Sequence, residues 1–77
     1  MRFFYYVSPL PDGQWELVSS LEPKPGRYTT REEALAAARH GCRRQWEDHG
    51  FPCGVRLREA EAWVDDHLVG EEPDFGQ

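Results

Sequence analysis

Residues 29–49 constrain the fold more than any other stretch, because they combine a helix start signal with a helical hydrophobic pattern. Thr30 is followed three positions later by Glu33, which is the spacing of a capping box. In that arrangement the threonine accepts from a helical N–H, and the glutamate reaches back to the N–H of the cap residue. Thr29 and Glu32 share this spacing, so the predicted start is defined to within one residue.

The pattern inside this segment predicts a helix that packs on one side only. At 3.6 residues per turn one stripe carries Ala34, Leu35, Ala38, Cys42, Trp46 and His49. The opposite side carries Glu33, His40, Arg44, Glu47 and Asp48. Gly41 costs about 1 kcal/mol relative to alanine in a helix interior, so we expect another group to pack closely beneath it. Gly50 and Pro52 then end the helix.

Strand-like segments lie on both sides of this helix. Alternating or continuous apolar and aromatic residues predict strands over residues 2–8, 14–19, 54–59 and 63–69. The first is apolar at nearly every position and is therefore expected to be central in the sheet. Residues 21–27 contain two prolines and a glycine and predict an extended connection to the helix. The closing hairpin turns at residues 60–62, which contain no glycine.

The order of these elements is ββαββ, which predicts a two-layer α+β domain, an antiparallel sheet with one amphipathic helix on one face. We expect residues 1–69 to form a single domain, since 77 residues are too few for two. Residues 70–77 are acidic and contain proline, which predicts a disordered C-terminal tail. The apolar start is too short for a signal peptide, and no segment is long enough to span a membrane. We therefore expect a cytoplasmic protein with no membrane partner.

One helix covers only one face of a sheet, so the other face is open to a partner. Alternation places the following residues on the helix side: Phe3, Tyr5, Val7, Trp15, Leu17, Val55 and Leu57. The open side then carries Phe4, Tyr6, Arg56 and Arg58, with Glu16 beside them. These four are the predicted binding residues.

Tyrosine, phenylalanine and arginine are enriched at the centres of protein interfaces. The sequence therefore predicts an interaction module that self-associates as a homodimer or binds a protein partner through this face. The same residues suit a single-stranded nucleic acid, whose bases stack on rings while its phosphates meet guanidinium groups. The formal charge of −5 and the absence of a known stacking motif favour the protein partner over nucleic acid.

Metal binding by His40, Cys42, His49 and Cys53 conflicts with helix geometry. Ligands on one helix sit three or four residues apart, whereas Cys42 and His49 are separated by about 10 Å along the axis. We therefore expect no metal and no cofactor.

A thiol-dependent enzyme is the third possibility, pairing Cys42 or Cys53 with His49 or His67 and an acid such as Asp66. No positioning motif accompanies these residues, and we expect two reduced, buried thiols and no enzymatic activity. Asp65 and Asp66 should point to opposite faces of a strand, which prevents shared acid–base chemistry.

The chain also resembles a group of small bacterial domains known only as conserved proteins of unknown function. The resemblance covers most of residues 3–69 and is carried by Tyr5-Tyr6-Val7, Gly13-Gln14-Trp15-Glu16-Leu17, the segment from Thr30 to Ala38 and a polar closing hairpin. It implies the two-layer fold and a bacterial cytosolic setting, and it transfers no catalytic residue. The turn at residues 60–62 departs from the glycine turn expected there.

Overall fold

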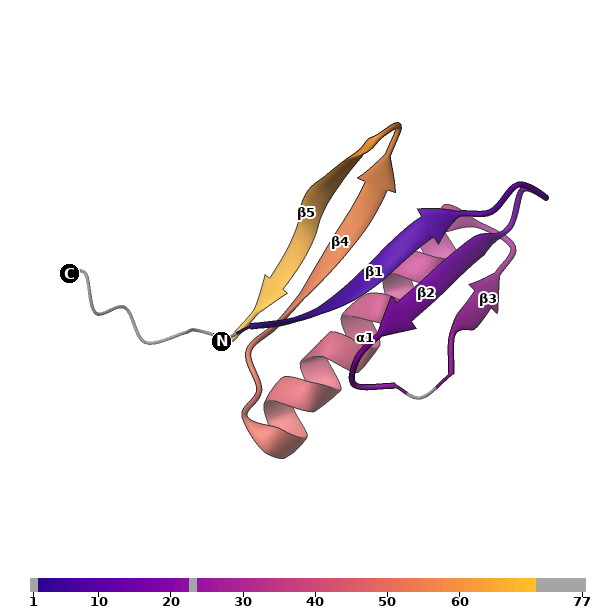
Figure 1. Ribbon diagram of the computed structural model, residues 1–77. Helices are drawn as coiled ribbons and strands as arrows, with labels where there is room; N and C mark the ends of the chain where they lie inside the picture. The colour runs from indigo at the N-terminus through magenta and orange to yellow at the C-terminus, as the bar shows by residue number, and fades with distance from the viewer. Residues whose placement is uncertain (1, 23, 71–77) are drawn as a thin grey trace.

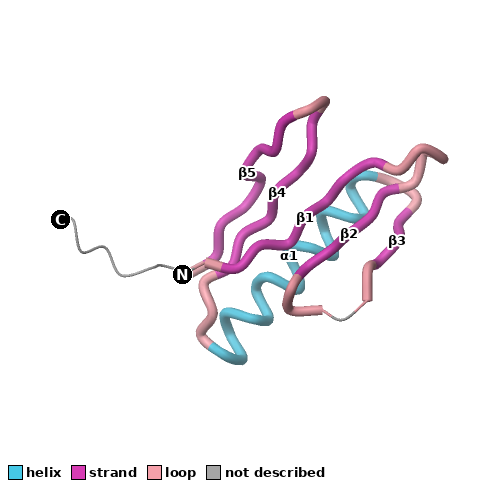
Figure 2. Tube along the Cα trace, viewed as in Figure 1, coloured by secondary structure: helices cyan, strands magenta, loops and turns pink. Residues whose placement is uncertain are grey.

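A computed structural model describes residues 2–22 and 24–70 of the chain. Its elements are β1 (Phe3–Pro9), β2 (Trp15–Ser19), β3 (Gly26–Tyr28), α1 (Arg31–His49), β4 (Cys53–Glu59) and β5 (Ala62–Val69). The strands form one sheet in the order β3-β2-β1-β4-β5, and α1 lies across one face of it (Figures 1 and 2). The predicted α+β class and the central position of β1 are confirmed. Residues 71–77 of the predicted tail lie outside the described residues.

The sheet is not wholly antiparallel as predicted, because β1 and β4 run parallel. The neighbouring pairs β1–β2, β2–β3 and β4–β5 are antiparallel. The difference arises from β3, which lies largely within the predicted extended connection over residues 21–27. This three-residue edge strand reverses the chain once more before the helix, so β4 re-enters the sheet in the direction of β1. The prolines and glycine of this segment led us to predict no strand there, although proline is tolerated in edge strands.

The helix start is capped by Thr30, whose side-chain oxygen accepts from the Glu33 N–H at 3.1 Å. The second half of the predicted capping box is wrong. The Glu33 carboxylate instead accepts a hydrogen bond from the Thr29 hydroxyl at 3.2 Å. Gly50 ends the helix in the left-handed conformation with φ 70°, and its N–H donates to the carbonyl of Trp46 at 2.9 Å.

The core lies between α1 and the sheet, and the helix contributes Ala34, Leu35, Ala38 and Cys42 to it. The strands supply Tyr5, Val7, Cys53, Val55, Leu57 and Val69. The predicted helix stripe is wrong at its C-terminal end, since Trp46 is 37% exposed and His49 is exposed. Gly70 packs against the Trp46 ring at the margin of the sheet and covers part of it.

Gly41 lies directly over the ring of Tyr5, which confirms the predicted close packing beneath this glycine. A Cβ at position 41 would be 3.0 Å from atoms of that ring, which is closer than ordinary van der Waals contact. The glycine therefore allows the helix to approach β1 and bury Tyr5, which is only 1% exposed.

The β4–β5 hairpin extends beyond the layer covered by α1 (Figure 1). Glu59 pairs with Ala62, so a two-residue loop joins the strands, and Ala60 in this loop has φ 54°. That conformation is normally taken by glycine, which is why a turn without glycine was difficult to interpret from sequence. A shift in register between Val55 and Arg56 leaves one extra residue, Asp66, on β5.

Candidate functional site

The four predicted binding residues lie together on the face of the sheet opposite α1. Tyr6 pairs with Arg56 across the parallel β1–β4 ladder, and Phe4 and Arg58 occupy the adjacent outward positions. The Arg56 guanidinium lies over the Phe4 ring at 3.7 Å from its centroid, which is a close cation–π contact. We name this surface the open face; it comprises Phe4, Tyr6, Ser8, Glu16, Val18, Arg27, Arg56, Arg58, Trp63, Asp65 and Leu68.

Trp63 is the largest open-face residue that was not predicted from the sequence. Its ring meets Tyr6 edge-on, with 5.2 Å between centroids and 77° between the planes. Arg58, which pairs with Trp63 across the hairpin, holds its guanidinium 5.9 Å from the centroid of that ring. Trp63 would have been found by carrying the alternation through a two-residue turn, because residues 58 and 63 then face each other.

Two further apolar residues complete the open face, Val18 beside Tyr6 and Leu68 beside Gly54. A Cβ at Gly54 would be 2.8 Å from the Phe4 ring and 2.9 Å from a methyl group of Leu68. The glycine therefore leaves the space into which both side chains lean. The result is an apolar surface that extends from β2 across β1 and β4 to β5.

The charges of the open face are partly compensated within the chain. The Arg56 Nε donates to the Asp65 carboxylate at 3.0 Å, and the Arg58 Nε donates to the carbonyl of Ala60 at 3.4 Å. Asp66 binds Arg39 of the helix with a closest approach of 2.7 Å, so the two aspartates serve opposite layers, as predicted. The two carboxylates do not form a shared acid–base site.

Cys42 and Cys53 are both free and fully buried between α1 and β4. Burial raises the pKa of the Cys42 thiol, and a contact with the Cys53 thiol raises it further. Burial likewise raises the pKa of Cys53. Nucleophilic cysteines require the opposite environment, one that lowers the thiol pKa and admits a substrate. Both thiols are therefore core groups.

The histidines do not converge on these thiols. His40 is exposed, His49 stacks on Phe51 at 5.2 Å, and His67 pairs with Val55 in the β4–β5 ladder. Within residues 2–22 and 24–70, no group of three or more His, Cys, Asp or Glu side chains could hold a metal ion.

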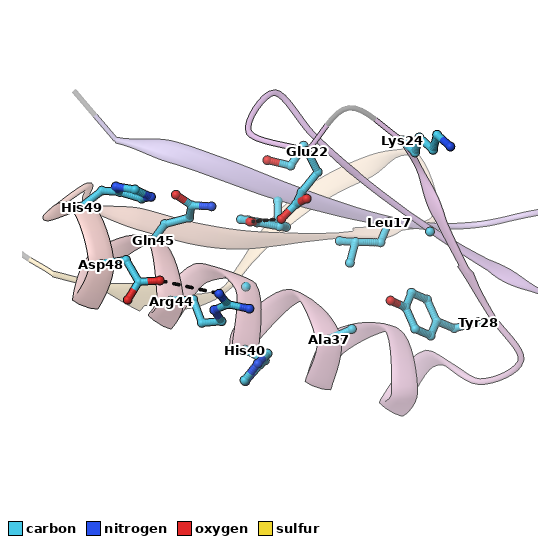
Figure 3. A pocket seen from close by; sticks show the side chains of 14 residues that line it. Leu17, Glu22, Lys24, Tyr28, Ala37, His40, Arg44, Gln45, Asp48 and His49 are labelled. Carbon is cyan, nitrogen blue, oxygen red and sulfur yellow. Dashed lines mark hydrogen bonds and ion pairs between the residues drawn. The ribbon is translucent and has the colours of Figure 1, made fainter.

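A polar cleft lies on the helix side of the sheet, between α1 and the segment that connects β2 to β3 (Figure 3). Its volume is about 550 Å³, and Tyr5 and Leu17 are among its lining residues. The Tyr5 hydroxyl donates to the Glu22 carboxylate at 3.2 Å, and burial raises the pKa of Tyr5 to about 12. Arg44 pairs with Asp48 at 3.7 Å on the same side (Figure 3). Two pairs of polar groups at the cleft thus satisfy each other, and no sequence pattern predicted that these residues gather there.

Comparisons with protein-family models, curated proteins and solved structures found no match to this chain. No helix in the described part of the chain has both the length and the apolar composition needed to cross a membrane. Fold and site together define a small α+β domain with an exposed aromatic sheet face.

Proposed function

We propose that this protein is an interaction module that binds another protein chain through the open face. The observation that carries the proposal is the clustering of exposed apolar side chains. Six large hydrophobic residues are exposed among the described residues, and three of them, Val18, Trp63 and Leu68, lie on this face at 42%, 45% and 54% exposure. Scattered apolar residues are normal on a surface, whereas a contiguous patch is typical of an interface.

Nucleic acid is the second candidate for the same face, and the ring geometry favours protein. Single-stranded bases stack on aromatic planes that are free. Here Arg56 covers one side of Phe4, and Tyr6 and Trp63 pack edge-to-face against each other. Arg56 is also neutralised by Asp65, which reduces its attraction for phosphate. The net charge of −5 acts in the same direction.

An interaction role also fits the chemistry of the remaining groups. The buried thiols have raised pKa values and no nearby histidine, and at the cleft Glu22 is bonded to Tyr5 and Arg44 to Asp48. These observations support a binding protein in preference to an enzyme. We also propose that the protein is bacterial and acts in the cytoplasm.

The experiment is site-specific photo-crosslinking in the cells that encode the chain. Ser8, on the open face, is replaced by p-benzoylphenylalanine, and Glu47, exposed on the helix, receives the same group as the control. We expect protein adducts from position 8 and none from position 47. Adducts to nucleic acid at position 8 would favour the second candidate. Equal adducts from both positions, or none from either, would refute the proposal.

A further inference from the structure

We propose that the partner on the open face is a second copy of this chain, related to the first by a twofold axis that runs along β1. This inference rests on the proposed interaction role of the open face and specifies its partner. It is carried by two independent features of that face, its size and the arrangement of its charges.

The size of the face matches a second sheet better than a peptide. The five strands contain 30 residues in all, and each residue covers about 3.3 Å by 4.8 Å of the sheet. The flat area is thus about 480 Å² before the relief of the side chains is added. Two such faces bury on the order of 1,000 Å² in total, which is about the lower limit for a biological interface. A single helix about 10 Å wide would leave about half of the width of the five strands uncovered.

The charges are arranged to complement a rotated copy. Glu16 pairs with Ser8 on one side of β1, and Arg58 follows Leu57, the partner of Val7, on the other side. Glu16 and Arg58 therefore lie at about the same level of the sheet, one on each flank of β1. Neither forms an ion pair with another described residue, and Arg27, the neighbour of Glu16 across the β2–β3 ladder, is paired with Asp12 at 3.9 Å.

A half turn about an axis along β1 places β2 of one copy opposite β4 of the other. Glu16 then faces Arg58 of the second copy, and the same pair recurs by symmetry, as in any isologous interface. Tyr6 meets Tyr6 of the second copy close to the axis. An axis across the strands would instead set β4 on β4 and oppose Arg56 to Arg56, so the charges select the axis along β1.

Charge reversal in the full-length chain tests this arrangement by sedimentation equilibrium. We expect the wild type to dimerise, and Glu16→Arg or Arg58→Glu alone to weaken the dimer by about tenfold or more, because like charges then face each other twice. The double variant Glu16→Arg/Arg58→Glu restores both pairs and should return the dissociation constant to within about threefold of the wild type. Circular dichroism verifies that each variant is folded. Should a reversal unfold the chain, Glu16→Gln and Arg58→Gln remove the charge without repulsion, and each should weaken the dimer by about threefold.

The outcomes separate the two proposals. A wild type that remains monomeric at millimolar concentration overturns the proposal that the partner is a second copy. Protein adducts at position 8 would in that case still support the interaction role. A dimer that is indifferent to both single reversals, or that the double variant fails to restore, overturns the twofold axis along β1. A dimer that persists when Tyr6 is replaced by serine overturns the proposal that a second copy occupies the open face, and the adducts at position 8 then decide the interaction role separately.

Discussion

Replacing Tyr5 with phenylalanine should make the fold less sensitive to alkali. The Tyr5 side chain is 1% exposed, and burial raises its pKa to about 12, against about 10 in an unfolded chain. Below pH 10 both states retain the phenolic proton. Above pH 10 the unfolded state loses it first, so the stability that Tyr5 contributes is lost as the pH rises towards 12.

The magnitude follows from the two pKa values. At pH 11 the unfolded state is favoured by about 1.4 kcal/mol relative to pH 8 through this one group. The hydrogen bond from the Tyr5 hydroxyl to Glu22 contributes about 1 kcal/mol at neutral pH. The wild type should therefore be more stable than Tyr5→Phe by about 1 kcal/mol at pH 7 and slightly less stable than the variant at pH 11.

Urea unfolding followed by helix circular dichroism at pH 7, 9, 10 and 11 measures this difference. The thiols of Cys42 and Cys53, whose pKa values are also raised, titrate in both proteins, and their effect cancels in the comparison. A difference between wild type and Tyr5→Phe that stays constant from pH 7 to 11 would refute the reasoning. It would mean that Tyr5 is not buried as a neutral phenol.

Three further substitutions test the local geometry by urea unfolding. Ala60→Gly should stabilise the fold by about 0.5 kcal/mol, because φ 54° strains alanine; a loss of stability would contradict the turn. Gly41→Ala should destabilise it by about 1 kcal/mol, since the clash with Tyr5 exceeds the gain in helix propensity; stabilisation would show that the helix is not in close contact there. Thr30→Ala should cost about 1 kcal/mol through loss of the bond from the Glu33 N–H, and no change would exclude Thr30 as the cap.

The sequence predicted the elements with local signals and failed where a long-range choice decided the outcome. The cap at Thr30 and the glycine stop at Gly50 are local chemistry, and both ends of α1 agree with the prediction. The direction of β4 depends on how many times the chain reverses before the helix. Because the three residues of β3 were missed, the sequence predicted a wholly antiparallel sheet, whereas β1 and β4 pair in parallel.

The candidate site was predicted in part for a similar reason. Phe4, Tyr6, Arg56 and Arg58 follow from period-two alternation within single strands, which needs no tertiary information. Trp63 and Leu68 lie beyond the hairpin turn, where the face of each residue depends on the loop length and on the extra residue at Asp66. The exposure of Trp46 was missed because helical periodicity does not show where the sheet beneath the helix ends.

The solution mass of the chain tests the central claim, that the open face binds a second copy, most directly. Light scattering over a concentration series should show the wild type rising from 8.9 kDa towards twice that mass. Phe51→Ser, which removes an aromatic of 38% exposure outside the open face, should behave as the wild type does. Tyr6→Ser should remain at the mass of one chain. A wild type that stays at 8.9 kDa throughout, or a Tyr6→Ser variant that dimerises equally well, would contradict the claim.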